Sequence, residues 1–116
     1  MPFQNPIPLR LKEARKKAKL SQKALGVRIG MDESSASPRM NQYEKGKHTP
    51  DVKTLKSLAD ALGVPLHYFF CEDEKTAELT TLINMMSYEE KCKLAVQLKN
   101  ILIERDNGKI QHNRSS

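Results

Sequence analysis

The sequence predicts an all-α protein in which five short helices form one domain and two further helices form a C-terminal hairpin. Three observations support this prediction. Apolar residues recur at helical spacing over most of the chain, and glycines and prolines divide it into segments of helix length. No segment shows the alternation of a half-buried strand. The 116 residues are enough for one compact domain with an appendage.

The first two helices are marked by their ends. Residues 1–8 contain three prolines and should form an extended arm, and residues 9–19 are strong helix formers. Ser21 stands where an N-cap of the second helix belongs, and Gly30 ends that helix in a left-handed conformation. Gly26 inside the helix costs about 1 kcal/mol relative to alanine. We therefore expect another backbone to pack closely against it.

The start of the third helix depends on a proline. Residues 31–37 are polar and rich in serine, and Pro38 follows them. Proline is tolerated in the first turn of a helix, where its missing N–H has no intrahelical partner. The helix should therefore start no earlier than Ser35 as N-cap, or Ser37 if Pro38 is the first residue, and should run to Glu44. A longer serine-rich loop is expected before it.

Two more helices complete the predicted domain. Residues 51–62 carry leucines at core spacing and end at Gly63, which we expect as the C-cap. Pro65 opens a short fifth helix, and Phe69 and Phe70 should close the core.

An acidic stretch at 72–74 indicates a boundary after this domain. Beyond it we expect helices at about 75–86 and 88–104, so that residues 71–104 form the C-terminal part. Residues 87–90, Ser-Tyr-Glu-Glu, are typical of a capping box. The polar residues 105–116 should be disordered.

Positive charge is concentrated in the first half of the chain. Residues 1–50 carry eleven Lys/Arg and four Asp/Glu, a net charge of +7, whereas residues 51–116 carry nine and ten, a net charge of −1. The basic half either faces a polyanion or is a solvated basic surface, and charge alone leaves both open. Aromatic residues make up only 5% of the chain, too few to stack single-stranded bases, so duplex DNA fits the pattern better.

Several classes of protein are disfavoured. No apolar stretch approaches the length of a membrane span, and Met1–Pro8 does not resemble a secretory signal. Cys71 and Cys92 are too few for a disulfide framework or a zinc site, and buried or half-buried free thiols in a reducing cytoplasm are expected. His48 and His67 lack a second ligand at metal spacing.

No enzyme or cofactor is predicted. The chain has no glycine-rich phosphate loop, no cluster of acidic residues and histidine, and no nucleophile beside a base. The residues after 70 are also too few and too helical to build a self-cleaving Ser-Lys protease domain.

Two segments together carry the functional signal. Residues 20–30 read Leu-Ser-Gln-Lys-Ala-Leu-Gly-Val-Arg-Ile-Gly, and residues 40–50 read Met-Asn-Gln-Tyr-Glu-Lys-Gly-Lys-His-Thr-Pro. A capped short helix, a glycine turn and a second short helix form a helix-turn-helix, which holds a recognition helix in the major groove. Their order, with the Leu-x-x-Leu-Ala-x-x-Leu-Gly-Val pattern at 55–64, resembles the Cro/repressor (XRE, lambda-repressor-like) family over residues 9–70.

The resemblance implies a lambda-repressor-like DNA-binding domain and assigns roles to particular residues. Gln22 would contact DNA backbone or a base edge, and Arg15 would form a structural ion pair with Glu44. The exposed third helix would meet base edges, where Arg suits guanine and Asn or Gln suits adenine. Lysines and a histidine beside the helices would contact phosphates. The candidate DNA contacts are Gln22, Lys23, Ser35, Ser37, Arg39, Asn41, Gln42, Lys45, Lys47 and His48.

One spacing departs from the family. Ten positions separate the turn glycine, Gly30, from the apolar Met40, where about six are usual. Ser34 and Ser35 in the expected loop can contact phosphate, and an acidic residue there can accept a hydrogen bond from cytosine. The alternative, that all of them are solvated loop residues, stays open.

The C-terminal helices offer an apolar stripe for association, formed by Leu94, Leu98, Ile101 and Leu102. The stripe can pack on residues 75–86 of the same chain or continue across a two-fold axis, as in a homodimer. The leading hypothesis is a cytoplasmic, nucleoid-associated regulator, bacterial or phage-encoded, that represses transcription as a dimer on a palindromic operator. The alternative is a partner-binding regulator, such as an antitoxin that represses its own promoter, with the C-terminal helices as its protein-interaction surface.

Overall fold

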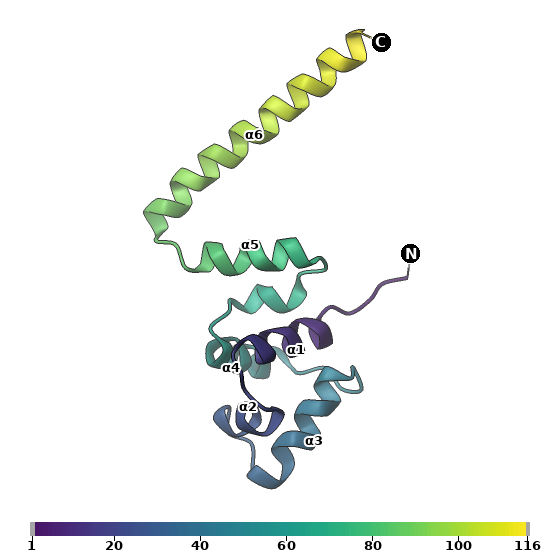
Figure 1. Cartoon of the computed structure of the whole chain (residues 1–116), viewed down its shortest axis with the longest axis vertical. Coiled ribbons are helices and arrows are strands. Elements are labelled where there is room, and N and C mark those ends of the chain that lie inside the picture. Colours follow the sequence, from purple (N-terminus) through teal and green to yellow (C-terminus); the bar gives the residue numbers. More distant parts are fainter. Residues whose placement is uncertain (1, 116) are drawn as a thin grey trace. The chain divides into compact units, whose positions relative to one another are not determined.

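The computed structural model describes the backbone of residues 2–115 and the side chains of residues 2–108 (Figure 1). Over this part of the chain the structure is helical without strands. Its elements are α1 (Ile7–Lys17), α2 (Gln22–Arg28), α3 (Glu33–Glu44), α4 (Val52–Leu62), the 3₁₀ helix η1 (Leu66–Phe70), α5 (Glu74–Asn84) and α6 (Tyr88–Ser115). They form two compact units, Met1–Asn84 and Met85–Ser116. The predicted all-α fold is confirmed.

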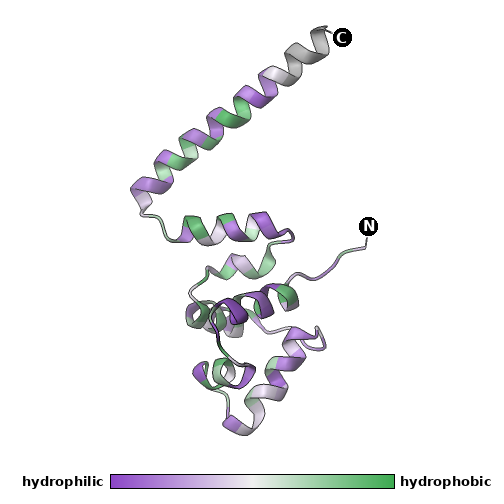
Figure 2. Cartoon of the chain, in the orientation of Figure 1, coloured by the Kyte–Doolittle hydropathy of each residue, from purple (hydrophilic) through white to green (hydrophobic). Residues whose placement is uncertain are grey.

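Every element from α1 to η1 contributes to one small core in the first unit. Its largest fully buried side chains are Leu11, Leu25, Met40, Leu55, Leu58 and Phe69. Figure 2 shows both apolar and polar residues on α1 and α4, as amphipathic helices packed on a core require. The core therefore packs α2 and α3 against α1, α4 and η1.

Local signals correctly placed three of the helix ends and the start of α6. The Ser21 hydroxyl accepts a hydrogen bond from the Ala24 N–H at 3.0 Å, as an N-cap does. Gly30 and Gly63 have φ angles of +98° and +71°, in the left-handed region that ends a helix. Ser87 and Glu90 exchange side-chain-to-backbone hydrogen bonds of 3.1 and 2.9 Å, which confirms the capping box.

The start of α3 corrects the predicted loop. The helix begins at Glu33, with Asp32 as the N-cap residue, so Pro38 lies inside it and the serine-rich stretch is helical. Ala36 explains this outcome, because it is completely buried. A loop could not hold it there in register with Met40, one turn later. Pro38 removes one backbone hydrogen bond, but it is exposed, and water can satisfy the freed carbonyl.

The buried aromatic residues of η1 also differ from the prediction. Phe69 is fully buried as expected, but Phe70 is 52% exposed and Tyr68 is buried in its place. A 3₁₀ helix has three residues per turn, so neighbouring side chains point about 120° apart. Phe70 consequently points outward when Phe69 faces the core.

Both boundaries of the first unit differ from those expected. The helix α1 starts at Ile7 rather than residue 9, with its N–H bonded to Asn5 Oδ1 at 3.1 Å, so the arm is shorter. Beyond the acidic stretch, Ala77 of α5 is buried in the same core. The compact unit that contains the predicted domain of residues 9–70 therefore extends to Asn84.

The second unit is the single helix α6, which continues through residues 105–115, where a disordered tail was expected. Ser116 and Met1 lie outside the described residues. Both predicted C-terminal helices are thus present, with α5 in the first unit and α6 in the second. Cys71 is buried, whereas Cys92, which we expected to be at least half-buried, is exposed.

Candidate nucleic-acid interface

A glycine allows α2 and α3 to pack closely against each other. A Cβ added at Gly26 would lie 2.7 Å from Ala36 Cβ, closer than real Cβ atoms approach, and 3.0 Å from Ala36 Cα. The missing side chain therefore lets the two helices touch at their backbones. This confirms the close approach expected at Gly26 and fixes the position of the first turns of α3.

An ion pair fixes the other end of α3. Arg15 of α1 donates from Nε and Nη2 to the two carboxylate oxygens of Glu44, at 2.6 and 3.0 Å, and from Nη1 to the Leu20 carbonyl at 2.9 Å. Both side chains are largely buried. Hydrogen bonding to Glu44 raises the pKa of Arg15, so the guanidinium remains charged.

Gln22 joins the start of α2 to the middle of α3. Its Nε2 donates to Asn41 Oδ1 at 3.3 Å and to Glu44 Oε1 at 3.2 Å, while its Oε1 accepts from the Ser37 hydroxyl at 3.5 Å. Three of the candidate DNA contacts, Gln22, Ser37 and Asn41, are thus brought together by direct contact. The bond from Gln22 restrains the Asn41 amide before any ligand arrives.

The exposed face of α3 follows from its buried residues. Because Ala36, Met40 and Tyr43 face the core, the side opposite them carries the exposed residues Ser34, Pro38, Asn41 and Lys45. We call these four residues the outer face of α3. Ser34 was expected in the loop before the helix, and Pro38 was expected in its first turn but not among the DNA contacts. Both positions could have been found from the sequence if Ala36 had been taken as a buried residue of the helix, but the predicted loop at 31–37 excluded this.

The remaining candidates on α3 lie on its other flank. Residues two apart on a helix point about 200° apart, so Arg39 points away from the flank that carries Ser37. Gln42 is exposed between Arg39 and the outer face. Ser35 is half-buried, and its hydroxyl donates to the Asp32 carbonyl at 3.3 Å.

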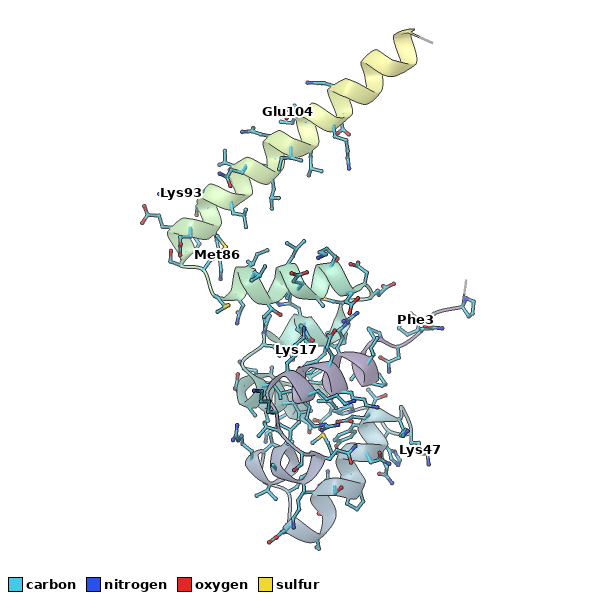
Figure 3. The ribbon with its side chains drawn as sticks, viewed as in Figure 1. Phe3, Lys17, Lys47, Met86, Lys93 and Glu104 are labelled. Atoms are coloured by element: carbon cyan, nitrogen blue, oxygen red, sulfur yellow. The ribbon has the colours of Figure 1, made fainter. Side chains whose placement is uncertain are left out.

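Basic residues frame the outer face. Lys45, Lys47 and His48 are exposed in or beside the turn after α3, and Figure 3 shows Lys47 projecting from this turn. Lys23 is also exposed but pairs with Glu33 at 2.8 Å, and this pairing lowers the pKa of Glu33. A surface pair of this kind is weak and exchanges readily.

A buried polar cluster that was not predicted from the sequence joins α1 to η1. Arg10 donates to the Cys71 carbonyl at 2.9 Å and to Glu13 at 2.8 Å, and the Tyr68 hydroxyl also donates to Glu13. Burial opposes charge on Glu13, but the hydrogen bonds from Tyr68 and Arg10 outweigh it and lower its pKa. Burial, and then the bond to Glu13, raises the pKa of Tyr68. The i,i+3 pair of opposite charges was the available signal.

Other kinds of site find no support in the described residues. No group of three His, Cys, Asp or Glu side chains there is arranged to hold a metal ion. None of the described helices combines the length and hydropathy that a bilayer crossing requires.

Comparison with known proteins agrees with this geometry. The helix-turn-helix family HTH_3 matches residues 11–69. The crystal structure of the transcriptional regulator BswR is similar, with 42% sequence identity and a TM-score of 0.77, over 84% of this chain and 97% of that one. No curated protein sequence matches the chain. The family is non-enzymatic, which confirms the prediction of no catalytic activity. The chain belongs to the XRE/Cro-C1 type of helix-turn-helix proteins and is a DNA-binding transcriptional regulator.

Proposed function

We propose that this regulator is a repressor that binds a palindromic operator as a homodimer, acting in the cytoplasm on the nucleoid. The observation that carries the proposal is the outer face of α3, with Asn41 held by Gln22. An asparagine amide can bond adenine through two hydrogen bonds in the major groove. Fixing the amide beforehand reduces the entropy lost on binding.

Each residue of the outer face has a chemistry suited to a base edge or the DNA backbone. The Pro38 ring is an exposed apolar group that can contact a thymine methyl, and the Ser34 hydroxyl can bond several bases. Lys45, Lys47 and His48 lie where phosphates would flank the helix. The Lys23–Glu33 pair would open to give Lys23 to a phosphate as well.

Selection of binding sites from random duplex DNA tests this proposal. We expect a palindromic motif whose half-site contains adenine at the position read by Asn41. Asn41→Ala should weaken binding by about 1–3 kcal/mol and remove the preference at that position. Asn84→Ala, an exposed asparagine at the end of α5, is the matched control and should bind as the wild type does. Failure to enrich any motif would contradict the proposal.

The dimer part of the proposal rests on α6. Leu98, Ile101 and Leu102 are exposed and Leu94 is half-buried, and their spacing places them along one side of the helix. Burying a side chain of this size contributes roughly 1.5–3 kcal/mol. A second copy would supply the same stripe across a two-fold axis, so each contact between the two stripes would occur twice.

Sedimentation analysis tests the dimer. The double variant Leu98→Asp, Ile101→Asp should be monomeric at concentrations where the wild type is a dimer, and its operator affinity should fall. The matched control is Gln97→Asp, Asn100→Asp, which adds the same charges on the polar side of α6. A monomeric wild type, or equal effects of both variants, would refute α6 pairing through this stripe.

One observation favours the alternative, a protein partner bound by α6. Val96 and Ile103 are 58% and 57% exposed and lie on the opposite side of α6 from Leu94. Apolar surface on two sides of a helix exceeds what a single stripe contact covers. If the wild type is monomeric alone and gains operator affinity only with a co-expressed partner, the partner-binding regulator replaces the homodimer.

A further inference from the structure

A cationic hollow lies beside the outer face of α3. Its volume is about 220 Å³, and it is lined by the turn between α2 and α3, by one residue of α3 and by the first half of α4. The lining residues are Ile29, Gly30, Met31, Arg39, Lys53, Thr54 and Ser57. Two of these side chains are cationic, two carry hydroxyls and none is acidic.

Neither cation of the hollow lies within 4 Å of a carboxylate in the described residues, although Lys53 is near enough to Asp51 to contribute to the lowered pKa of that carboxyl group. Lys56, on the same helix as Lys53, pairs with Asp60 at 2.8 Å, and Lys23 pairs with Glu33. Arg39 and Lys53 form no such pair in the part of the chain whose side chains are described. Like charges lining one hollow repel each other, so an anion there would stabilise both.

The chemistry of the lining selects a phosphate among anions. The planar guanidinium of Arg39 can donate two parallel hydrogen bonds to phosphate oxygens, and the Lys53 ammonium adds a point charge. The Thr54 hydroxyl can donate a further bond. A hollow of 220 Å³ holds a phosphate group easily, but lies below the range of about 300–1,000 Å³ typical of sites for whole small molecules.

The place of the hollow indicates where the phosphate comes from. An α-helix with its side chains is about 10–12 Å wide, close to the width of the major groove, so residues on both flanks of a recognition helix meet sugar-phosphate backbone. Ser37 lies on the flank of α3 that contacts Gln22 of α2, and Arg39 lies on the other flank. The α4 residues Lys53 and Thr54 extend this second flank.

We propose that the cationic hollow binds a backbone phosphate of the DNA strand opposite to the one met by α2. The inference rests on the proposed function, since it requires α3 in the major groove. It reassigns Arg39, which the sequence suggested as a reader of guanine, to a phosphate contact. Arg39 then contributes affinity for every sequence and specificity for none.

The test combines affinity, salt dependence and base preference on the operator selected by the wild type. Arg39→Gln and Lys53→Gln should each weaken binding to the operator and to its single-base variants by the same factor. Each should also reduce the slope of log affinity against log salt by about 1. Lys56→Gln, which removes an ion-paired lysine from the same helix, is the control and should leave the slope unchanged. Loss of discrimination at one G·C pair in Arg39→Gln, with no effect of Lys53→Gln, would overturn the proposal.

A second arm distinguishes DNA phosphate from a free phosphate compound. Inorganic phosphate is titrated into the DNA-free full chain at constant ionic strength, and amide shifts of Gly30, Met31 and Thr54 are followed by NMR. Shifts that disappear in Arg39→Gln and Lys53→Gln, together with the reduced salt slopes, support the proposal. If inorganic phosphate saturates the hollow of the wild type but Arg39→Gln and Lys53→Gln bind DNA with unchanged affinity, the phosphate bound by the hollow does not come from DNA.

The same arm separates failure of this inference from failure of the proposed function. If the wild type selects no DNA sequence, the proposed function fails and DNA as the source of the phosphate fails with it. Phosphate-dependent amide shifts at the hollow would in that case still indicate an anion-binding site, but not one that binds DNA. A selected operator with unchanged slopes and no phosphate shifts would overturn the hollow and leave the proposed function standing.

Discussion

Replacing Gly26 by alanine separates two opposing effects at the α2–α3 contact. Intrinsic helix propensity favours alanine over glycine by about 1 kcal/mol, so α2 considered alone predicts stabilisation. The added Cβ would lie 2.7 Å from Ala36 Cβ and 3.0 Å from Ala36 Cα. These atoms move only if the α3 backbone moves, unlike the flexible Met31 sulfur at 3.1 Å.

The size of the effect follows from these contacts. Overpacking costs about 1–3 kcal/mol, and contact with backbone places this case in the upper part of that range. After the propensity gain, we expect a net loss of about 1–2 kcal/mol. In a unit of this size that lowers the melting temperature by roughly 10 °C. Operator affinity should fall as well, because the first turns of α3 are displaced.

Thermal unfolding followed by circular dichroism measures the loss. Ala24→Gly, at an exposed position of the same helix, is the control and should report the propensity difference alone. Gly26→Ala combined with Ala36→Gly should be less destabilised than the sum of the two single variants, since the closest atom pair is gone. A higher melting temperature in Gly26→Ala would refute the close-contact reasoning.

Three further predictions concern the supports of α3. Arg15→Met should destabilise the protein by roughly 3 kcal/mol in urea unfolding, because it leaves the Glu44 carboxylate buried without its partner; adding Glu44→Leu should recover most of the loss. Pro38→Ala should raise the free energy of unfolding by roughly 2 kcal/mol by restoring a backbone hydrogen bond, and an unchanged or lower value would contradict an interior position. The raised pKa of Tyr68 contributes stability that is present below the ordinary tyrosine pKa of about 10 and lost as pH rises above it. Urea unfolding between pH 8 and 11 should therefore show a steeper loss in the wild type than in Tyr68→Phe, in which Glu13 also lacks this donor; parallel curves would refute the assignment.

The order of helices was predictable because it depends on local rules. Capping by Ser21, the left-handed glycines at 30 and 63 and the capping box at 87–90 each act within a few residues. The family motifs depend on the same short spacings, which is why the helix-turn-helix was identified from the sequence.

Tertiary contacts explain what local rules missed. The local cost of an interior proline predicted a loop before Pro38, but burial of Ala36 against Gly26 outweighs that cost and keeps the stretch helical. Without this anchor the phase of α3 is unknown, so Arg39 and Ser37 were assigned to one face although they lie on opposite flanks. The exposure of Phe70 was also not predictable from local rules, because a 3₁₀ turn and an α turn direct its side chain differently.

The extra residues of α3 acquire a physical meaning from these contacts. Counting from Gly30 to Ala36, rather than to Met40, gives the usual six positions of the family, so the four additional residues form one helical turn between two buried side chains. They lengthen the helix by about 6 Å, nearly the rise of two base pairs. Because Ala36 is fixed on α2 and Glu44 on Arg15, the added turn lies between two anchors and cannot fray. It therefore lengthens the outer face, which under the proposed function would lie along the major groove, and Asn41, just beyond the added turn, accepts a hydrogen bond from Gln22.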